Sequence, residues 1–354
     1  MIKIHSDFIG GNICVKSIHG DVITLENELR DSTEWFYWAF CVENAEGREL
    51  TFHMQKDRLG YFGPAVSHDL KKWHWLDSSD GDSFTYRFGS DEKKVYFAHN
   101  MLYHPDHFLD FLREYDIKST ELCKSRKGRS VPCITLGEGE KSIILTARHH
   151  ACESTGSYVL EGVLREFIEA PIENTVIFAV PFVDYDGVID GDQGKGRTPH
   201  DHNRDYTENP IYPEVDAIIK YADRYGCHLG FDFHSPWHKG GENDNIFIVR
   251  KRIEKQDRYE RFSDILQKEI SRTDIVYAKE NDHPPMTGWN QEPSPSFSYT
   301  MNSREECDLA FTLETAYFGT ENNKISTDML IRLGRSFAKA IKNYIEVTKE
   351  NYEL

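Results

Sequence analysis

Four residues with metal-binding or acid–base side chains have types and spacing that suggest zinc chemistry: His150, Glu153, His234 and Glu314. His150 and Glu153 are three positions apart where an apolar strand pattern gives way to a helical one, and residues at that spacing project from one side of a helix. His234, at the end of a later strand pattern, can complete a set of three ligands. Two histidines and one glutamate leave a fourth position open for water, which is typical of a catalytic zinc.

Glu314 is the candidate for the general base. Zinc lowers the pKa of a bound water from about 15.7 towards ~7, but the reaction also needs a proton acceptor that does not bind the metal. Partial burial at the end of an apolar strand would raise the pKa of the Glu314 carboxyl into the range where it takes and returns a proton. A solvated end-of-strand glutamate is the alternative, and the accompanying metal ligands favour catalysis.

Asn203 and Arg204 lie in a long polar stretch, residues 184–206, that is rich in Gly and Asp. Loops of this length in compact domains are commonly functional. A guanidinium presents two parallel donors to a carboxylate, and an asparagine amide adds another, so the pair predicts a clamp for the free carboxylate of a peptide or an amino acid. The alternative is a surface ion pair between Arg204 and Asp205 or Asp201.

Composition narrows the class of protein. The 354 residues carry a net charge of -17, and the one basic cluster, residues 124–129, is short, so a nucleic-acid partner is not expected. The seven cysteines are scattered singly, which argues against a disulfide framework and agrees with a reducing cytoplasm. Neither a signal-peptide pattern nor a run of about 20 apolar residues is present, so we expect a soluble cytoplasmic protein without a membrane partner.

The elements that must position these residues change character along the chain. Residues 1–115 show short alternating patterns separated by Gly, Asn and Asp turns, including an aromatic run from Glu34 to Val42. This pattern predicts an antiparallel β-sandwich domain. Trp73 and Trp75 have strand spacing, and we interpret them as core residues in preference to a ligand platform.

Residues 116–354 show unbroken apolar runs that alternate with helical patterns. Such an alternation is typical of an α/β domain with a mainly parallel, mixed sheet that helices cover on both faces. In these sheets functional groups gather beyond the carboxyl ends of the strands, where all four candidate residues fall. The expected strands are 142–148, 175–181, 228–234, 245–250 and 309–314, and the expected helices are 153–169, 213–225, 252–270 and 326–349.

Five short segments carry a family resemblance: 147–153, 186–188, 201–204, 232–235 and 313–315. With these segments the chain resembles the zinc carboxypeptidases of the M14 type, and in particular their cytosolic subgroup, whose catalytic domain follows an extra N-terminal β-sandwich. The resemblance implies a zinc carboxypeptidase-like fold for residues 116–354 and one zinc ion per chain.

The same resemblance assigns roles to individual positions. It implies that the metal ligands are His150, Glu153 and His234, that Glu314 is the general base and acid, that Asn203 and Arg204 receive the terminal carboxylate, and that Asp201 orients a ligand histidine from the second coordination shell. His149, four residues from Glu153, is a rival ligand that the family pattern disfavours. We expect His200, His202 and His238 to make ordinary hydrogen bonds, although a second metal is an alternative.

Three positions match the family less well. Cys152 precedes the ligand glutamate where pancreatic-type enzymes have arginine, so that substrate contact is absent. The cation that stabilises the oxyanion is either Lys195 or Arg197, and we favour Arg197. The mobile tyrosine of the family should precede Glu314, and Tyr299 is the candidate.

The leading hypothesis is therefore a zinc metallocarboxypeptidase that hydrolyses a C-terminal peptide bond, or its side-chain-branched equivalent, with zinc-activated water and Glu314 as general base. A zinc amidohydrolase that deacylates N-acyl amino acids is the alternative, since its substrate also offers a free carboxylate to Arg204. An inactive protein that binds peptide tails through its sandwich belongs to a third class, which the complete set of ligands and base disfavours. Substrate preference and oligomeric state stay open.

Overall fold

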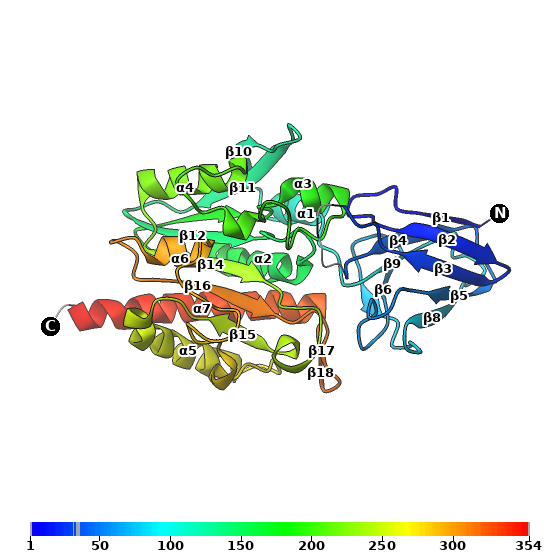
Figure 1. Cartoon of the computed structure of the whole chain (residues 1–354). Coiled ribbons are helices and arrows are strands. Elements are labelled where there is room, and N and C mark those ends of the chain that lie inside the picture. Colours follow the sequence, from blue (N-terminus) through cyan, green and yellow to red (C-terminus); the bar gives the residue numbers. More distant parts are fainter. Residues whose placement is uncertain (1, 31, 33–35, 353–354) are drawn as a thin grey trace.

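The computed structural model describes residues 2–30, 32 and 36–352. The first two residues of the predicted aromatic strand, Glu34 and Trp35, therefore lie outside the described part of the chain. Strands of the first third form one end of the molecule, and a large sheet with its helices forms the other (Figure 1). No helix in the described ranges has both the length and the apolar character that crossing a membrane requires.

The N-terminal part is a sandwich of two sheets. One sheet has the order β1 (Lys3–His5), β4 (Ala39–Glu43), β9 (Lys94–Ala98), β6 (Ala65–Ser67) and β7 (His74–Trp75), and the other has β2 (Cys14–His19), β3 (Val22–Glu26), β5 (Glu49–His53) and β8 (Ser83–Arg87). Phe40, Phe52 and Phe97 meet between them. The predicted antiparallel sandwich is confirmed, except that β3 and β5 pair in parallel.

A seven-stranded mixed sheet forms the centre of the second part, and it is reached through α1 (Pro105–Glu114). Its order is β10 (Thr120–Lys124), β11 (Ser130–Leu136), β13 (Thr175–Val180), β12 (Lys141–Ala147), β14 (Leu229–His234), β16 (Leu309–Thr315) and β15 (Ile246–Val249). The four central strands are parallel, and the edge strands run antiparallel to their neighbours. The predicted fold class is thus confirmed.

Helices cover both faces of this sheet because successive apolar side chains of each buried strand point to opposite sides. Ile143 and Leu145 of β12 pack with α2 (Ser154–Glu169), α5 (Gln256–Ile270) and α7 (Thr327–Tyr352). Ile144 packs instead with α4 (Pro213–Tyr225) and α6 (Phe297–Asn302). The remaining α-helix and β-strands of the described residues are α3 (Tyr185–Asp190), β17 (Gly319–Thr320) and β18 (Asn323–Lys324), and short 3₁₀ turns lie in the connections.

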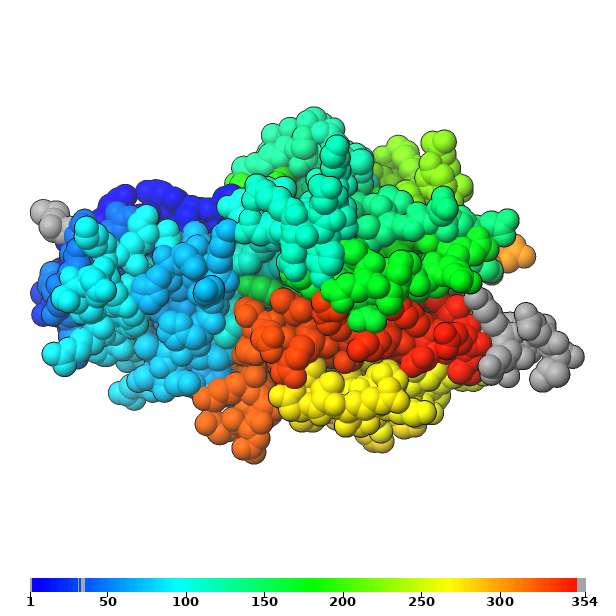
Figure 2. Space-filling view, turned by 180° about the vertical axis from the view of Figure 1, so that it is seen from behind, coloured from blue at the N-terminus to red at the C-terminus, as the bar shows by residue number. Residues whose placement is uncertain are grey.

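One of the hydrophobic clusters spans both parts, beside a separate cluster between the two sheets of the sandwich. Phe36 of the sandwich lies edge-on to Tyr317, with 5.7 Å between ring centroids, and Trp75 lies 5.4 Å from Phe318. Trp73 and Trp75 are both buried, as their interpretation as core residues requires. Seen from behind, the blue and cyan sandwich packs directly against the second part (Figure 2). The division into domains 1–115 and 116–354 stays our proposal, since the spanning cluster crosses it.

The structure corrects several expected elements. The hairpin of β10 and β11 and the short helices α3 and α6 were not expected, because β10 is short and largely polar, β11 contains a proline, and the helices are only six residues long. The helix expected from residue 252 begins at Gln256. Arg252 has a φ of 56°, which lies outside the helical region and delays the helix.

Candidate active site

Three parallel strand ends bring the candidate residues together. β12 and β16 both flank β14, and His234 is in register with Glu314 on β16. Ala147, at the end of β12, is in register with Phe233. Because parallel neighbours end at the same edge of a sheet, the turn after β12 lies beside His234 and Glu314.

The turn between β12 and α2 carries His150 and Glu153. Arg148 has a φ of 64°, and its buried guanidinium donates to the carbonyl oxygens of Ala151, at 2.7 Å, and Tyr103, at 3.0 Å. Glu153 is the residue before α2, so the pair lies in the turn itself and not on the helix. Gly156 lets α2 approach β14, because a Cβ there would lie 2.4 Å from the carbonyl oxygen of Phe233.

His150, Glu153 and His234 form a candidate metal centre. Their ligand atoms all lie within 4.8 Å of one another, and the three side chains are buried. Nδ1 of His150 lies 2.8 Å from Oε1 of Glu153, and Nδ1 of His234 lies 2.7 Å from Oε2. Oε2 is buried, and its contact with His234 lacks the geometry of a hydrogen bond. Ligand atoms that crowd together in this way, one of them without a well-formed hydrogen bond, fit a cation held between two imidazoles and a carboxylate.

The electrostatics of this centre depend on neighbouring carboxylates. Burial disfavours a charged imidazole, but Asp232 and Glu153 outweigh it and raise the pKa of His234 well above its usual value. Burial likewise opposes ionisation of Glu153, yet His150 and Lys195 hold the pKa of that carboxyl well below its ordinary value. A metal cation bound by the histidines and Glu153 would replace the protons on the imidazoles and balance the negative charge of the carboxylates.

A carboxylate lies beside the far nitrogen of each candidate ligand histidine. Asp201 is 3.5 Å from Nε2 of His150, close to the arrangement that the family resemblance implies. Asp232 is 2.6 Å from Nε2 of His234 and was missed by sequence reasoning. The signal was available, because residues two apart on a strand share a face. Such partners fix which ring nitrogen faces the metal.

The rival ligand His149 lies behind the metal centre. Its Nδ1 is 2.8 Å from Asp232 and its Nε2 is 2.8 Å from the hydroxyl of Tyr206, so hydrogen bonds occupy both ring nitrogens. The other three histidines do not gather into a second centre within the described residues. They contact different partners: His200 contacts Asp205, His202 lies near Asp184 and Glu214, and His238 contacts His99.

Glu314 lines the same cleft, which has a volume of about 440 Å³. Its side chain is buried and Oε2 has no hydrogen-bond partner, so the carboxyl is not committed to a structural role. Burial raises the pKa of Glu314, and the negative charge of Glu153 raises it further. These properties suit a group that takes and returns a proton.

Asn203 and Arg204 line the cleft from a short 3₁₀ turn, His202–Arg204. Oδ1 of Asn203 accepts a hydrogen bond from the main-chain N–H of Phe297 at 3.0 Å, which leaves the amide nitrogen 3.2 Å from Nε2 of His234. Arg204 is exposed and donates to the carbonyl oxygen of Asn203 at 2.9 Å. A cationic fork and an amide therefore stand near the metal centre.

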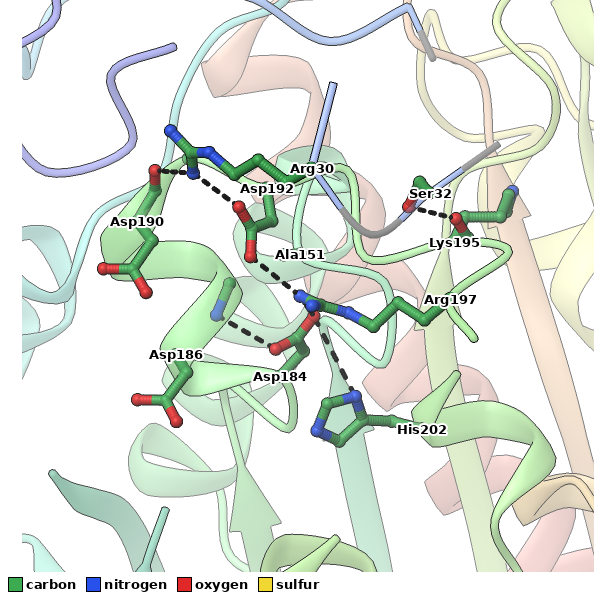
Figure 3. Close-up of polar contacts among 12 residues, drawn as sticks. Arg30, Ser32, Ala151, Asp184, Asp186, Asp190, Asp192, Lys195, Arg197 and His202 are labelled. Carbon is green, nitrogen blue, oxygen red and sulfur yellow. Dashed lines mark hydrogen bonds and ion pairs between the residues drawn. The ribbon is translucent and has the colours of Figure 1, made fainter. Parts of the chain in front are cut away.

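The structure does not bring Arg197 into the cleft, contrary to the role we favoured for it. Its guanidinium lies 2.6 Å from Asp184 and 3.2 Å from Asp192, within a cluster of acidic residues (Figure 3). Lys195 does line the cleft, and its Nζ is 2.9 Å from Oε1 of Glu153. Arg197 lies outside the cleft because the buried carboxylates of Asp184 and Asp192 pair with its guanidinium.

Tyr299 is likewise not among the residues that line the cleft. It is half-buried on α6, where the guanidinium of Arg252 lies 5.5 Å from the centre of its ring. The aromatic residues that the described cleft does contain are Trp237 and Trp289, both about half exposed. Cys152, where pancreatic-type enzymes have arginine, is buried with Sγ 3.3 Å from the hydroxyl of Tyr317.

Lys251 is a cleft residue that sequence reasoning missed. It is buried, its Nζ donates to Oδ1 of Asn290, and it lines the cleft with Ser298 and Thr312. Burial and the nearby charge of Arg204 lower the pKa of Lys251 to about 8. The sequence shows only that Lys251 follows a predicted strand, and many surface lysines occupy such a position without lining a cleft.

Glu214 and His202 face a separate cavity of about 650 Å³. Oε2 of Glu214 is 3.9 Å from Nε2 of His202 and has no hydrogen-bond partner. Burial raises the pKa of the Glu214 carboxyl from 4.5 to about 8. The folded protein therefore binds this proton more tightly than the unfolded chain does, and stability should fall as pH rises between these two values.

Replacing Glu214 by glutamine should remove this pH dependence. The variant should gain stability relative to the parent protein between about pH 5 and about pH 8.5, as measured by urea unfolding at both pH values. Glu208→Gln, in an exposed loop, is the matched control and should leave the difference unchanged. An equal stability difference at the two pH values for Glu214→Gln would show that the carboxyl is not buried in solution.

Comparisons with known proteins agree with this geometry. An uncharacterized protein of Zymomonas mobilis is 27% identical over 258 residues, which cover 66% of this chain and 67% of that protein. Cytosolic carboxypeptidase 2 of Xenopus tropicalis is 28% identical over 283 residues, which cover 64% of this chain and 29% of that protein. The crystal structure of a metallo-carboxypeptidase from Burkholderia cenocepacia has a TM-score of 0.81 at 18% identity, covering 98% of this chain and all of that one. No family model matches the chain.

The chain thus has the fold of the M14-type metallocarboxypeptidases. By sequence it is similar to the cytosolic carboxypeptidases, and the resemblance that its motifs indicated is confirmed. The alignment spans less than a third of the length of the cytosolic carboxypeptidase that it matches. The predicted class of enzyme agrees with the names of these relatives.

Proposed function

We propose that the protein is a zinc-dependent carboxypeptidase. The observation that carries this proposal is the meeting of His150, Glu153 and His234 in one cleft with Glu314 and with the Asn203–Arg204 pair. One zinc bound by the first three residues would supply Lewis acidity, polarising the scissile carbonyl and making water acidic enough to react at neutral pH. The names of the relatives suggest a cytoplasmic location, which we also propose.

The protein's own residues bind and orient the substrate. Arg204 and Asn203 would hold the terminal carboxylate, since a guanidinium fork matches a carboxylate and the neighbouring amide adds a donor. Glu314 would take a proton from the attacking water and deliver it to the nitrogen of the leaving amine. Its buried position and raised pKa suit both transfers.

Lys195 would stabilise the negative charge that develops on the carbonyl oxygen. Its Nζ lies at the metal centre, 2.9 Å from Glu153, whereas Arg197 is held by Asp184 and Asp192. Burial opposes the charge on Lys195, but Glu153 and Glu314 outweigh it and raise the pKa of the ammonium, so it stays cationic. A preorganised cation of this kind lowers the barrier in a site from which water is largely excluded.

The terminal residue of the substrate would be polar or acidic. Lys251, Ser298 and Thr312 present hydrogen-bonding groups to the cleft, and no aliphatic cluster accompanies them among the described lining residues. An apolar side chain would leave these groups unsatisfied, which costs about 1–3 kcal/mol for each buried group. Trp237 and Trp289 offer flat surfaces to the rest of the peptide.

The decisive experiment is hydrolysis of short peptides that differ only at the C-terminus. We expect release of the last residue from peptides with a free carboxylate, little release from C-terminal amides, and loss of activity after chelation that zinc restores. Faster release of Glu or Gln than of Leu would support the polar site. Cleavage of N-acyl amino acids without cleavage of peptides would instead establish the deacylase alternative, and inactivity towards both would overturn the proposal.

A further inference from the structure

The segment from Ile189 to Arg197, which we call the lysine segment, connects α3 with the loop of the carboxylate clamp and contains Lys195. We propose that the N-terminal sandwich positions Lys195 by holding this segment against the metal centre. This inference rests on the proposed function for the role of Lys195, and it assigns a task to the sandwich. Figure 3 shows Arg30 and Ser32 of the sandwich part beside Asp192, Lys195 and Arg197.

Hydrogen bonds to main-chain carbonyl oxygens join the first half of the segment to the start of the chain. The main-chain N–H of Gly10 donates to the carbonyl oxygen of Ile189 at 3.0 Å, and the side-chain amide of Asn12 donates to the carbonyl oxygen of Gly191 at 2.8 Å. Gly191 has a φ of 76°, and a Cβ there would lie 2.3 Å from the carbonyl oxygen of Gly11. The two segments therefore approach so closely that a side chain at position 191 has no room between them.

The second half of the segment is held by the stretch that leads into β4. Oε1 of Gln193 accepts hydrogen bonds from the main-chain N–H groups of Phe36 and Tyr37, both at 3.1 Å. The hydroxyl of Ser32 donates to the carbonyl oxygen of Lys195 at 2.7 Å, and Ser32 forms an antiparallel bridge with Arg197. The main chain of Lys195 is thus fixed directly by a residue of the sandwich part.

A row of ion pairs reinforces these contacts. Arg30 donates to Oδ1 of Asp192 and to the carbonyl oxygen of Asp190, each at 2.5 Å. Oδ2 of Asp192 lies 3.2 Å from Arg197, which also pairs with Asp184 at 2.6 Å. Asp192 is buried, so solvent and salt screen its attraction to the two arginines less than they screen a surface ion pair. Arg30 therefore connects the sandwich directly to Asp192, which precedes Lys195, and through Asp192 to Arg197, which follows it.

The other side of the lysine segment contacts the turn of the metal ligands. The N–H of Cys152 donates to the carbonyl oxygen of Gln193 at 3.1 Å, and a Cβ on Gly194 would lie 2.3 Å from the main-chain nitrogen of Ala151. Nζ of Lys195 lies 2.9 Å from Glu153. The segment is confined between the sandwich and this turn, so loss of the sandwich contacts would release it on one side only.

Arg30→Gln tests this inference, because glutamine cannot replace the paired donors. We expect faster hydrogen–deuterium exchange at the amides of the lysine segment, with unchanged exchange in the central strands. We also expect kcat to fall about tenfold with KM little changed, since a displaced catalytic group loses rate without losing substrate binding. Arg48→Gln is the matched control, because Arg48 pairs with Asp21 on the exposed side of the sandwich.

A double-mutant cycle separates positioning from general destabilisation. If Arg30 acts through Lys195, Arg30→Gln should have almost no effect on kcat in a Lys195→Ala background. An equal fall in both backgrounds, or unchanged exchange in the lysine segment, would overturn the inference. Hydrogen exchange needs no turnover, so a protein without peptidase activity would refute the proposed function while the exchange data still decide whether the sandwich holds the segment.

Discussion

Under the proposed mechanism, Glu314→Gln should lower kcat about 10²-fold to 10⁴-fold while zinc binding is retained. Glutamine preserves the shape of the side chain but cannot accept and return a proton, and Glu314 is not one of the three residues that form the metal centre. The burial that raises the pKa of this carboxyl also excludes most of the water that could substitute for it. The measurement is kcat on a peptide with a free C-terminus, together with the zinc content of the purified variant.

Glu242→Gln provides the matched control for this substitution. Glu242 also lines the cleft, but it is exposed and contacts Trp289 and His283 at the rim. The same chemical change there should alter kcat by less than the change at Glu314, because no proton transfer depends on it. Near-full turnover in Glu314→Gln would exclude the residue as the general base, and loss of zinc would show that its role is to hold the metal.

The meeting of the three residues of the candidate metal centre was predictable because they lie where local patterns end. An unbroken apolar run predicts a buried strand, and parallel strands bring their carboxyl ends to one edge. Histidine and glutamate just beyond two such ends, at 150, 153 and 234, can therefore be expected to meet without knowledge of the tertiary structure. The spacing argument was less accurate in detail, since Glu153 precedes α2 and does not lie on it.

The roles that sequence could not resolve depend on side-chain direction within loops. Lys195 and Arg197 are two positions apart in a segment with several glycines at positive φ, and no periodic rule states which way either side chain points. The guanidinium of Arg197 is held away from the cleft by the buried carboxylates of Asp184 and Asp192, whose own positions depend on α3 and on Arg30 of the sandwich. The contact between Arg30 and Asp192 joins residues 162 positions apart, which local pattern cannot reveal.

Tyr299 illustrates a different limit. The family resemblance requires a tyrosine before Glu314, and sequence order alone selected this one from a Pro-rich region without a strong periodic pattern. The structure places it on α6 beside Arg252, away from the lining of the cleft. Lys251 was missed for the converse reason, because a single lysine after a strand carries no signal until the strand is seen to border the cleft.

Lys195→Ala should lower kcat about 10²-fold to 10³-fold with little change in KM, if Lys195 supplies the cation for the oxyanion. The ammonium lies beside the candidate metal centre, and its electrostatic stabilisation is greatest in the transition state, when the carbonyl oxygen becomes negative. Lys195→Arg should recover part of the rate because the charge returns with a different shape. Steady-state kinetics and zinc content should be measured together, since Lys195 also contacts the ligand Glu153.

Arg197→Ala is the comparison that makes this test specific. Its loss would leave the buried carboxylate of Asp184 without its arginine partner and Asp192 with Arg30 alone, which should cost about 3–5 kcal/mol in the free energy of unfolding measured with urea. We expect a much smaller effect on kcat, measured at a temperature where the variant is still folded. A large fall in kcat for Arg197→Ala with unchanged stability, alongside a nearly active Lys195→Ala, would return the oxyanion role to Arg197.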